Sequence, residues 1–246
     1  MPSPCVDVWL ADIDAVGEAL DALERRFSLL TADERARARG LDSLRARRWT
    51  RTRVALRALL ASQVGVPSAQ NPFQLSAAGK PRLAEGGLEF SLSHSGRFAL
   101  IALSHAGPVG VDIETRNQVN MHPDRLQAIE SAAIALAPDA LLPARDDATR
   151  FVQAWTRLEA LAKATGTGIG ALLTSLGIRG PAEALGDHAK PAMLSDLLIA
   201  DGCSLRITDL RLGCAAAVAG PASAGVVLRR LPASLSDLTD LTGLAV

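Results

Sequence analysis

This chain has few aromatic residues and no tyrosine, so aromatic side chains cannot supply most of its core. Only 3% of its 246 residues are aromatic, whereas 48% are hydrophobic. We therefore expect a core of aliphatic side chains, and the hydrophobic content is ample for one. The length fits either one large domain or two small ones.

The chain also lacks net charge, long apolar runs and a leader pattern. Its 26 basic residues balance its 26 acidic ones, so the overall charge favours neither nucleic acid nor a membrane as a partner. No apolar run approaches the roughly 18 residues that a membrane-spanning helix needs. The N-terminus does not show the basic-then-apolar pattern of a signal peptide. We expect a soluble, cytoplasmic protein.

Cysteine is scarce and follows no pattern. Cys5, Cys203 and Cys214 are scattered and do not have the spacing of a metal or redox motif. An odd number of unpaired cysteines is typical of a reducing compartment. This agrees with a cytoplasmic location.

Positive charge is concentrated in residues 35–57, which hold nine arginines and a single acidic residue, Asp42. One interpretation is a solvated helix face. Another is a phosphate site, because guanidinium groups form paired hydrogen bonds to phosphate oxygens. Composition leaves both interpretations open.

Apolar periodicity and turn signals predict the elements of the first half. Strands are expected at residues 6–13, 88–93, 98–103 and 109–113, the last three as a compact meander with a hairpin turn at Ser95-Gly96. A helix is expected at residues 16–30. Thr31 and Glu34 form a capping box, so further helix should run from there to Val64, before Gly65 and Pro67.

The second half is predicted to repeat the order of helix and then strands. Helices are expected at residues 126–137 and from Asp146 or Asp147 to Thr165, where Gly166 ends the helix. Strands are expected at residues 195–200, 204–207 and 214–219, with a short one beginning at Ile178. Residues 228–246 are leucine-rich and form either a packed arm or a frayed tail.

Two segments carry residue types that bind a metal ion and a phosphate. Asp112 and Glu114 lie at i and i+2 near the end of an expected strand, so both carboxylates face the same side and can reach one cation. Glu159 and Lys163 lie at i and i+4 on an expected helix and are neighbours on its surface. Together they suit Mg²⁺ and a diphosphate. An ordinary Glu159–Lys163 ion pair is the structural alternative.

A helical wheel places Glu159 and Lys163 at the edge of an apolar stripe. The stripe consists of Phe151, Trp155, Leu158 and Ala162. An unpaired charge beside a buried stripe is costly. This position favours a cleft over a plain surface ion pair.

These segments resemble the signatures of the 4′-phosphopantetheinyl transferase family, in its long two-lobed (Sfp-like) type. The first signature, G-[IV]-D-[IV]-E, is intact at residues 110–114. The second, W-[ST]-x-K-E-[AS]-x-x-K, matches residues 155–163, except that Leu158 replaces the lysine before the glutamate. Gly79-Lys80-Pro81 and the segment 91–96 (Ser-Leu-Ser-His-Ser-Gly) match two lesser elements. The four occur in family order and cover about residues 30–220.

One family element is missing from the chain. Residues 115–148 do not show the phenylalanine-rich segment with a following S-x-x-E that the family usually has there. This departure concerns the surface that would face a carrier protein.

The resemblance implies an α+β fold of two similar lobes, each a helix packed on a small antiparallel sheet, related by a pseudo-twofold axis. The implied divisions are residues 1–112, residues 113–225 and a C-terminal arm at 226–246. Coenzyme A would lie in the cleft between the lobes. No residue-level repeat is found from the sequence to support this symmetry.

The resemblance also implies an activity, which is transfer of the 4′-phosphopantetheine group of coenzyme A to a serine hydroxyl of an apo acyl or peptidyl carrier protein. The other product is 3′,5′-ADP. Mg²⁺, with Mn²⁺ as the alternative ion, would be held by Asp112, Glu114 and Glu159. Glu159 would take the serine proton, while Lys163 and His94 would neutralise phosphate charge.

Further residues are implied as contacts of coenzyme A. They are Arg37, Arg48, Lys80, Pro81, Ser93, His94 and Lys163. The expected partners are coenzyme A and an apo carrier protein, with no nucleic acid or membrane, and the protein is expected to be a monomer. Neither the carrier nor its pathway follows from the sequence.

Two other functions remain open. One is another Mg²⁺-dependent enzyme of phosphate esters, which would release phosphate without a carrier protein. The other is a catalytically inactive module that binds coenzyme A or a carrier, an interpretation that the Leu158 departure leaves open.

Overall fold

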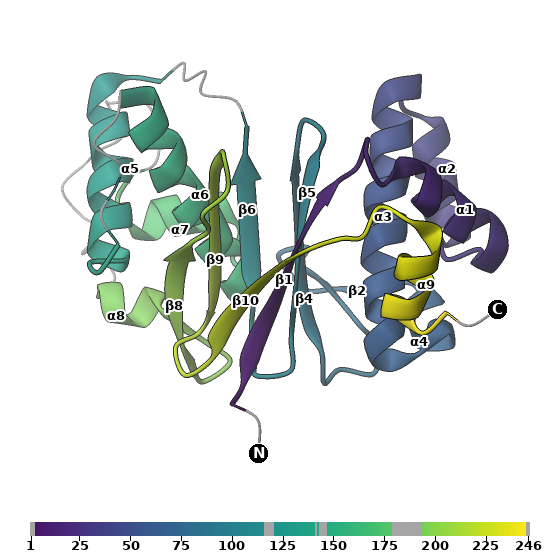
Figure 1. Cartoon of the computed structure of the whole chain (residues 1–246). Coiled ribbons are helices and arrows are strands. Elements are labelled where there is room, and N and C mark those ends of the chain that lie inside the picture. The colour runs from purple at the N-terminus through teal and green to yellow at the C-terminus, as the bar shows by residue number, and fades with distance from the viewer. Residues whose placement is uncertain (1–2, 116–120, 141, 143–146, 179–192, 245–246) are drawn as a thin grey trace.

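The computed structural model describes residues 3–115, 121–140, 142, 147–178 and 193–244. The chain has an α+β fold in which helices pack on small, mainly antiparallel sheets in two lobes that stand side by side (Figure 1). The expected fold class is therefore confirmed. The expected divisions after residues 112 and 225 each fall within a strand, the first within β6 (Gly110–Glu114) and the second within β10 (Gly225–Arg230).

The sheet of the first lobe has four strands in the order β10-β1-β5-β4. They are β1 (Cys5–Asp12), β4 (Glu89–Ser95), β5 (Phe98–Ser104) and β10 (Gly225–Arg230). β4 and β5 form the expected hairpin, and β5 pairs antiparallel with β1. β10 joins from the C-terminal end of the chain and runs parallel to β1.

Helices cover one side of this sheet. They are α1 (Gly17–Phe27), α2 (Ala32–Arg39), α3 (Ser43–Val64), α4 (Val66–Gln70) and α9 (Leu235–Thr242). The expected capping box begins α2, since Thr31 Oγ1 accepts the Glu34 amide and the Glu34 carboxylate accepts the Thr31 amide. Two short strands, β2 (Gln74–Leu75) and β3 (Pro81–Arg82), pair with each other beside the sheet.

The second lobe has the strand order β6-β9-β8-β7. Its strands are β6 (Gly110–Glu114), β7 (Ile199–Ala200), β8 (Cys203–Asp209) and β9 (Ala215–Pro221). Its helices are α5 (Pro123–Leu136), α6 (Asp147–Thr165), α7 (Ile169–Ser175) and α8 (Leu194–Leu197). α6 packs across β6 and β9 and carries the largest share of this lobe's buried core.

The two lobes share one topology. The order β1-β5-β4 in the first sheet corresponds to β6-β9-β8 in the second, with a hairpin in the last two strands of each. Matching the lobes in this way reveals a short repeat that the sequence alone did not disclose. Trp-Thr-Arg occurs at 49–51 in α3 and at 155–157 in α6. This match aligns Arg53 with Glu159.

A separate apolar core joins the lobes. It takes Val8 and Leu100 from the first sheet and Val111, Ile113 and Val218 from the second, all at most 1% exposed. β4 lies beside β6 at this junction, although the two belong to different sheets. The lobes are therefore held in one fixed arrangement by burial.

Two expectations for individual elements were wrong, and a third is not tested. The strand at 109–113 does not complete a meander with the β4–β5 hairpin, because it pairs with β9 instead. The strand expected at 195–200 is a turn of helix, α8, followed by the two residues of β7. The short strand expected to begin at Ile178 runs into residues outside those described.

The C-terminal segment is a packed arm. After β10, Leu231, Leu238 and Leu244 are buried in the core of the first lobe, at 6%, 0% and 2% exposure. Among the described residues, no helix has the length and apolarity needed to cross a membrane.

Candidate active site

Three serines of β4 connect the two sheets at their junction. Because side chains alternate along a strand, Ser91, Ser93 and Ser95 share one face of β4, and all three are buried. Ser91 Oγ accepts the Val111 amide at 3.1 Å. Ser93 and Ser95 donate hydrogen bonds to carboxylates of β6. The serines therefore set the position of β6 against β4.

Asp112 is buried and only partly satisfied. Its Oδ1 accepts Ser93 Oγ at 2.7 Å and Lys163 Nζ at 2.6 Å. Its Oδ2 is buried and has no hydrogen-bond partner among the described residues. A buried carboxylate oxygen without a partner is costly, and a bound cation would remove that cost.

Glu114 lies on the same face of β6 as Asp112, as the i, i+2 spacing predicts. Its Oε2 accepts Ser95 Oγ at 2.9 Å, while the Ser95 hydroxyl also accepts the Thr115 amide at 3.0 Å. Both carboxylates therefore face β4 and the junction of the lobes.

Helix α6 is buried along most of its length. Trp155, Glu159 and Lys163 are partly exposed and lie at i, i+4 and i+8, so they share one line on the helix. Trp155 was expected within the buried stripe, but it lies on this partly exposed line and stacks on Phe151 with ring centroids 6.1 Å apart. Leu158, the departure from the family signature, is 0% exposed and packs in the core of the second lobe.

The close approach of α6 to β6 depends on Gly110, the residue with which the 110–114 segment begins. A Cβ at Gly110 would overlap the backbone of α6 at Ala160 and Ala164. Without a side chain at this point, the strand can lie directly against the helix. The close packing brings the Asp112 carboxylate of β6 to the Lys163 ammonium of α6, although the two residues are 51 positions apart in the sequence.

Glu159 has an unfavourable environment for its charge. Burial raises the pKa of its carboxyl above the ordinary 4.5; the negative charges of Asp112 and Glu114 raise it further, and Lys163 opposes them. Three carboxylates thus influence one another electrostatically at the junction. The single nearby ammonium does not offset this effect.

A cavity of about 310 Å³ opens beside Glu159 and Lys163. Its wall is formed by the β2–β3 turn, β4, α6 and the loop that follows α6. The lining residues include Lys80, Pro81, Phe90, Leu92, Glu159, Lys163 and Ile169. The cavity therefore lies between the lobes, and its lining includes both apolar and charged side chains.

Arg53 of α3 also lines this cavity, although no local pattern distinguishes it from the other eight arginines of residues 35–57. Burial lowers the pKa of the Arg53 guanidinium, and the positive charges of Arg57 and Arg37 lower it further. The negative charge of Glu34 raises this pKa but does not outweigh those effects. The Arg53 guanidinium lies 5.4 Å from the centre of the Trp49 ring. The Trp-Thr-Arg repeat that aligns Arg53 with Glu159 points to it, but only after the strands of the two lobes have been matched.

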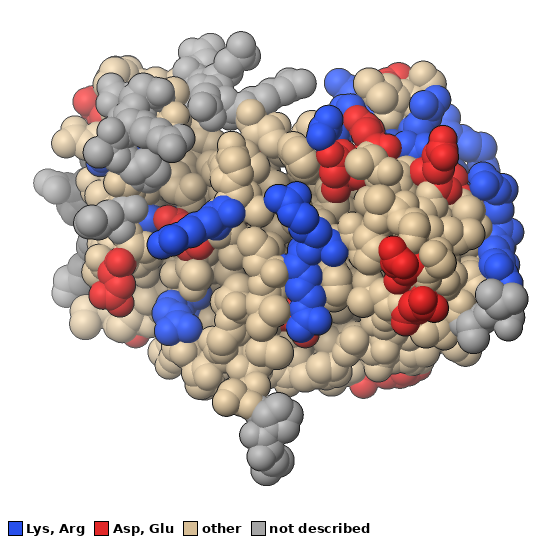
Figure 2. All heavy atoms as spheres, viewed as in Figure 1, with Lys and Arg blue, Asp and Glu red and all other residues tan. Residues whose placement is uncertain are grey.

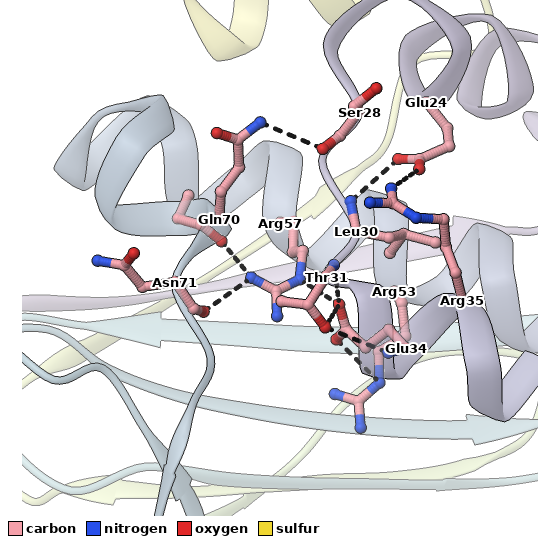
Figure 3. A network of polar contacts seen from close by, with 11 residues as sticks. Glu24, Ser28, Leu30, Thr31, Glu34, Arg35, Arg53, Arg57, Gln70 and Asn71 are labelled. Carbon is pink, nitrogen blue, oxygen red and sulfur yellow. Dashed lines mark hydrogen bonds and ion pairs between the residues drawn. The ribbon is translucent and has the colours of Figure 1, made fainter.

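Glu34 holds Arg53 within a network of polar contacts between α2 and α3 (Figure 3). The Glu34 carboxylate accepts Arg57 Nε at 2.6 Å and lies 3.9 Å from Arg53 Nε. Arg57 is 1% exposed and also donates to the carbonyls of Ala69 and Asn71. Arg57 therefore has a structural role, whereas Arg53 extends from the same carboxylate to the cavity.

His94 lies on the face of β4 opposite the three serines. Partial burial lowers the pKa of its imidazole, and the positive charges of Lys163 and Arg53 lower it further. Three basic side chains, Arg53, His94 and Lys163, thus lie within electrostatic range of one another. Such a group favours an anion.

The arginines expected to bind phosphate are already engaged. Arg48 binds Asp14 through two hydrogen bonds, at 3.2 and 2.6 Å, and Arg37 lies with its guanidinium 5.6 Å from the centre of the Trp49 ring. Figure 2 shows basic and acidic side chains interleaved over the helices of the first lobe. Much of the arginine-rich stretch is therefore paired with acidic residues of its own lobe.

The residues at the junction suit a divalent cation, although they do not form a complete ligand set as they stand. Among the described residues, no group of three or more His, Cys, Asp or Glu side chains is arranged to hold a metal ion. Asp112 nevertheless offers a buried oxygen without a partner, and Glu114 and Glu159 supply further hard oxygen donors. These donors match the preference of Mg²⁺ and Mn²⁺.

The fold and this site together define a two-lobed α+β protein whose carboxylates, lysine and cavity meet between the lobes. The family model of the 4′-phosphopantetheinyl transferase superfamily matches residues 108–215. That range contains β6, α6 and β8 and ends at the first residue of β9, the strand that pairs with β6. It therefore includes all three carboxylates.

Two curated proteins are similar over most of their length. The 4′-phosphopantetheinyl transferase HetI of Nostoc sp. is 33% identical over 175 residues, which cover 68% of this chain and 71% of HetI. The putative 4′-phosphopantetheinyl transferase slr0495 of Synechocystis sp. is 31% identical over 182 residues, or 69% of this chain and 67% of the relative. The chain belongs to the 4′-phosphopantetheinyl transferase superfamily, and it is an enzyme of that activity.

Proposed function

We propose that the protein transfers 4′-phosphopantetheine from coenzyme A to a serine hydroxyl of an apo acyl or peptidyl carrier protein and releases 3′,5′-ADP. The observation that supports this most strongly is the meeting of Asp112, Glu159 and Lys163 beside a cavity between the lobes. The names of the two relatives support the same reaction.

Coenzyme A would lie with its diphosphate in the part of the cavity that Glu159 and Lys163 line. Lys163 gives one of its three ammonium donors to Asp112, and its side chain is 31% exposed, so it can also donate to a phosphate oxygen. The β2–β3 turn, with the backbone of Lys80 and Pro81, forms the wall for the adenosine part. Arg37, Arg48, Ser93 and His94 remain proposed contacts, and we add Arg53, whose charge faces the cavity.

Asp112, Glu114 and Glu159 would hold Mg²⁺ or Mn²⁺. When bound, the cation would neutralise charge on the diphosphate and polarise its phosphorus–oxygen bonds. Ser93 and Ser95 would then keep Asp112 and Glu114 oriented through their hydrogen bonds.

In the transfer, Glu159 would accept the proton of the carrier's serine, directly or through a water molecule. Glu159 lines the cavity beside Lys163, so its carboxylate is within reach of a serine hydroxyl that enters there. The serine oxygen forms a bond to the β-phosphorus, and the bond from that phosphorus to the bridging oxygen breaks. The bridging oxygen and its electron pair leave with 3′,5′-ADP, while Lys163 and His94 offset the charge that develops.

The reaction is tested with the purified protein, coenzyme A, Mg²⁺ and several apo carrier proteins. We expect one pantetheine-phosphate mass to be added to the carrier in intact-protein mass spectrometry, and 3′,5′-ADP to appear in equal amount. A carrier whose acceptor serine is replaced by alanine is the control. Unmodified carriers together with release of phosphate from coenzyme A would instead identify a hydrolase.

The protein is further proposed to act as a cytoplasmic monomer. Size-exclusion chromatography with light scattering, with and without carrier, tests the monomer. A stable dimer of the free chain would contradict it.

A further inference from the structure

Lys80 was expected to contact coenzyme A, but the structure directs its ammonium group into the protein. The turn between β2 and β3 is fixed by Ser76, whose hydroxyl accepts the Lys80 amide at 3.0 Å and whose own amide donates to the Lys80 carbonyl at 2.9 Å. Gly79 adopts φ +83°, which the turn requires. This rigid turn directs the lysine side chain inward, where it is 7% exposed.

The ammonium of Lys80 has three protein partners within reach. Lys80 Nζ lies 3.1 Å from Glu89 Oε2, 3.1 Å from the carbonyl of Ala164 and 3.4 Å from the carbonyl of Val109. The two carbonyls accept hydrogen bonds from the ammonium, whereas Glu89 Oε2 is its ion-pair partner without a hydrogen bond of good geometry. Burial lowers the pKa of Lys80, whereas the Glu89 carboxylate raises it and favours the charged form.

The three partners of the ammonium belong to the three elements that carry the site. Ala164 follows Lys163 in the last turn of α6, Val109 precedes Gly110 at the start of β6, and Glu89 begins β4. The carbonyl of Ala164 is one of the last four of its helix, which have no partner within the helix and favour a cation. One buried ammonium therefore joins α6, β6 and β4 at the same point.

We propose that Lys80 is a positioning residue for the transferase site and does not bind a phosphate of coenzyme A. Lys80 sets the spacing between α6 and β6. This spacing determines the contact of Lys163 with Asp112 and the direction in which the Glu159 side chain enters the cavity. Turning the ammonium to a phosphate would leave the Glu89 carboxylate, 23% exposed, without its buried partner. This inference rests on the proposed function, because it concerns the same site.

The test is Lys80→Met, which keeps a long apolar side chain and removes the charge. We expect kcat to fall about tenfold or more, as for residues that orient an active group, and the Mg²⁺ concentration for half-maximal rate to rise. The dissociation constant of coenzyme A, measured by calorimetry without metal, should stay within about threefold. The preference for coenzyme A over 3′-dephospho-coenzyme A should be unchanged.

Arg82→Met is the matched control. Arg82 lies two residues away and is also near Glu89, at 3.9 Å, but it is 42% exposed and pairs with Asp201 at 3.1 Å. Its loss should leave kcat and coenzyme A binding near the wild-type values. If Lys80→Met instead weakened coenzyme A binding and abolished the preference for the 3′-phosphate while kcat held, Lys80 would be a phosphate ligand and the proposal would be overturned.

Glu89→Gln provides a second test if the methionine variant does not fold. A positioning lysine predicts a lower kcat with unchanged coenzyme A binding, because the amide oxygen still accepts but the ion pair is lost. A phosphate-binding lysine predicts tighter coenzyme A binding, since its competitor has gone. Failure of the wild-type protein to transfer phosphopantetheine would count against the proposed function, whereas these variants test only the role of Lys80.

Discussion

At the scale of single residues, Glu159 shows a conflict between function and stability. Its carboxyl is partly buried beside Asp112 and Glu114, and its pKa is raised. A raised pKa means that the folded protein binds the proton more tightly than the unfolded chain does. The stabilising effect is therefore present below the ordinary value of 4.5 and is lost as pH rises through the folded pKa.

Glu159→Gln should abolish transfer yet stabilise the metal-free protein. We expect a rate loss of about 100-fold or more, because general-base catalysis is removed. With EDTA present, the free energy of unfolding should exceed that of the wild type at pH 7 to 8, and the difference should shrink toward pH 4. Denaturant titrations across this pH range measure it. A variant that is less stable than the wild type at pH 8 would contradict the interpretation.

Arg53→Met should reduce recognition of the 3′-phosphate of coenzyme A. In the proposed binding mode the diphosphate lies at the carboxylates and Lys163, so the 3′-phosphate is the one left for Arg53, another cation of the cavity. A hydrogen bond to a charged group contributes about 1.5–3 kcal/mol, so the preference for coenzyme A over 3′-dephospho-coenzyme A should fall about tenfold or more. Calorimetry with both ligands measures the preference.

Arg51→Met is the control for Arg53. Arg51 lies on the same helix, but it binds Asp21 through two hydrogen bonds at 3.0 and 2.6 Å. Its replacement should lower stability without changing the preference between the two ligands. An unchanged preference in Arg53→Met would mean that Arg53 does not contact that phosphate.

The contrast between these residues explains what the sequence could predict at this scale. Asp112 and Glu114 are placed by strand alternation, and Glu159 and Lys163 by helical spacing, both of which are local rules. Arg53 is one of nine arginines with similar local surroundings. Its selection depends on which side of α3 faces the cavity that β4 and α6 also line, and local spacing does not specify that.

At the scale of elements, the contact of β6 with α6 is the feature on which the site depends. Gly110 lies where the strand meets the helix backbone, and three serines of β4 form hydrogen bonds with β6 at the Val111 amide and at the carboxylates of Asp112 and Glu114. The strand was predicted from its apolar pattern. Its sheet was not, because a short apolar strand carries no information about whether it pairs with the preceding hairpin or with β9, which begins about 100 residues later.

Gly110→Ala should separate these two elements. The added Cβ would overlap the backbone of α6, which is not free to move aside as a side chain is, so we expect a loss of about 3 kcal/mol or more in the free energy of unfolding. Transfer should fall with it, since Asp112 would no longer reach Lys163. Chemical denaturation of the purified variant provides the measurement.

Gly170→Ala is the matched control. Gly170 lies in α7, and nothing is within 4 Å of a Cβ at that position, so the substitution should be neutral or stabilise by up to about 1 kcal/mol. Equal stability of the two variants would show that β6 does not depend on a glycine for its approach.

At the scale of the whole molecule, the two lobes are similar in topology but not separate in folding. The core between them draws on both sheets, and β10 returns from the second lobe to pair with β1 of the first. The two-lobed fold was implied by the family resemblance and not by composition. The sequence repeat at Trp49 and Trp155 is too short to be distinguished from chance until the strands are matched.

The C-terminal arm was left undecided by its sequence because leucines with polar interruptions fit a packed arm or a frayed tail equally well. The structure shows α9 against α1 and α3. Its buried leucines complete the core of the first lobe. The arm is therefore a contributor to stability, at a distance in sequence from every proposed site residue.

Removal of residues 231–246 should destabilise the protein without acting on the chemistry of the site. The deletion uncovers the core that Leu231, Leu238 and Leu244 fill, and each buried leucine contributes about 1.5–3 kcal/mol. A total of roughly 5 kcal/mol is a large part of the stability of an ordinary domain. We expect thermal denaturation at a much lower temperature, or a chain that aggregates.

Leu238→Ala provides a graded form of the same experiment. This leucine is 0% exposed, so its truncation should cost about 2–5 kcal/mol, whereas Asp240→Ala, exposed on the same helix, should change little. At a temperature where Leu238→Ala is still folded, its dissociation constant for coenzyme A should match that of the wild type, because the cavity is formed by α3, β4, α6 and the β2–β3 turn. Weaker binding by a fully folded Leu238→Ala would show that the arm acts on the cleft through α3, and the lobes would then have to be treated as one coupled unit.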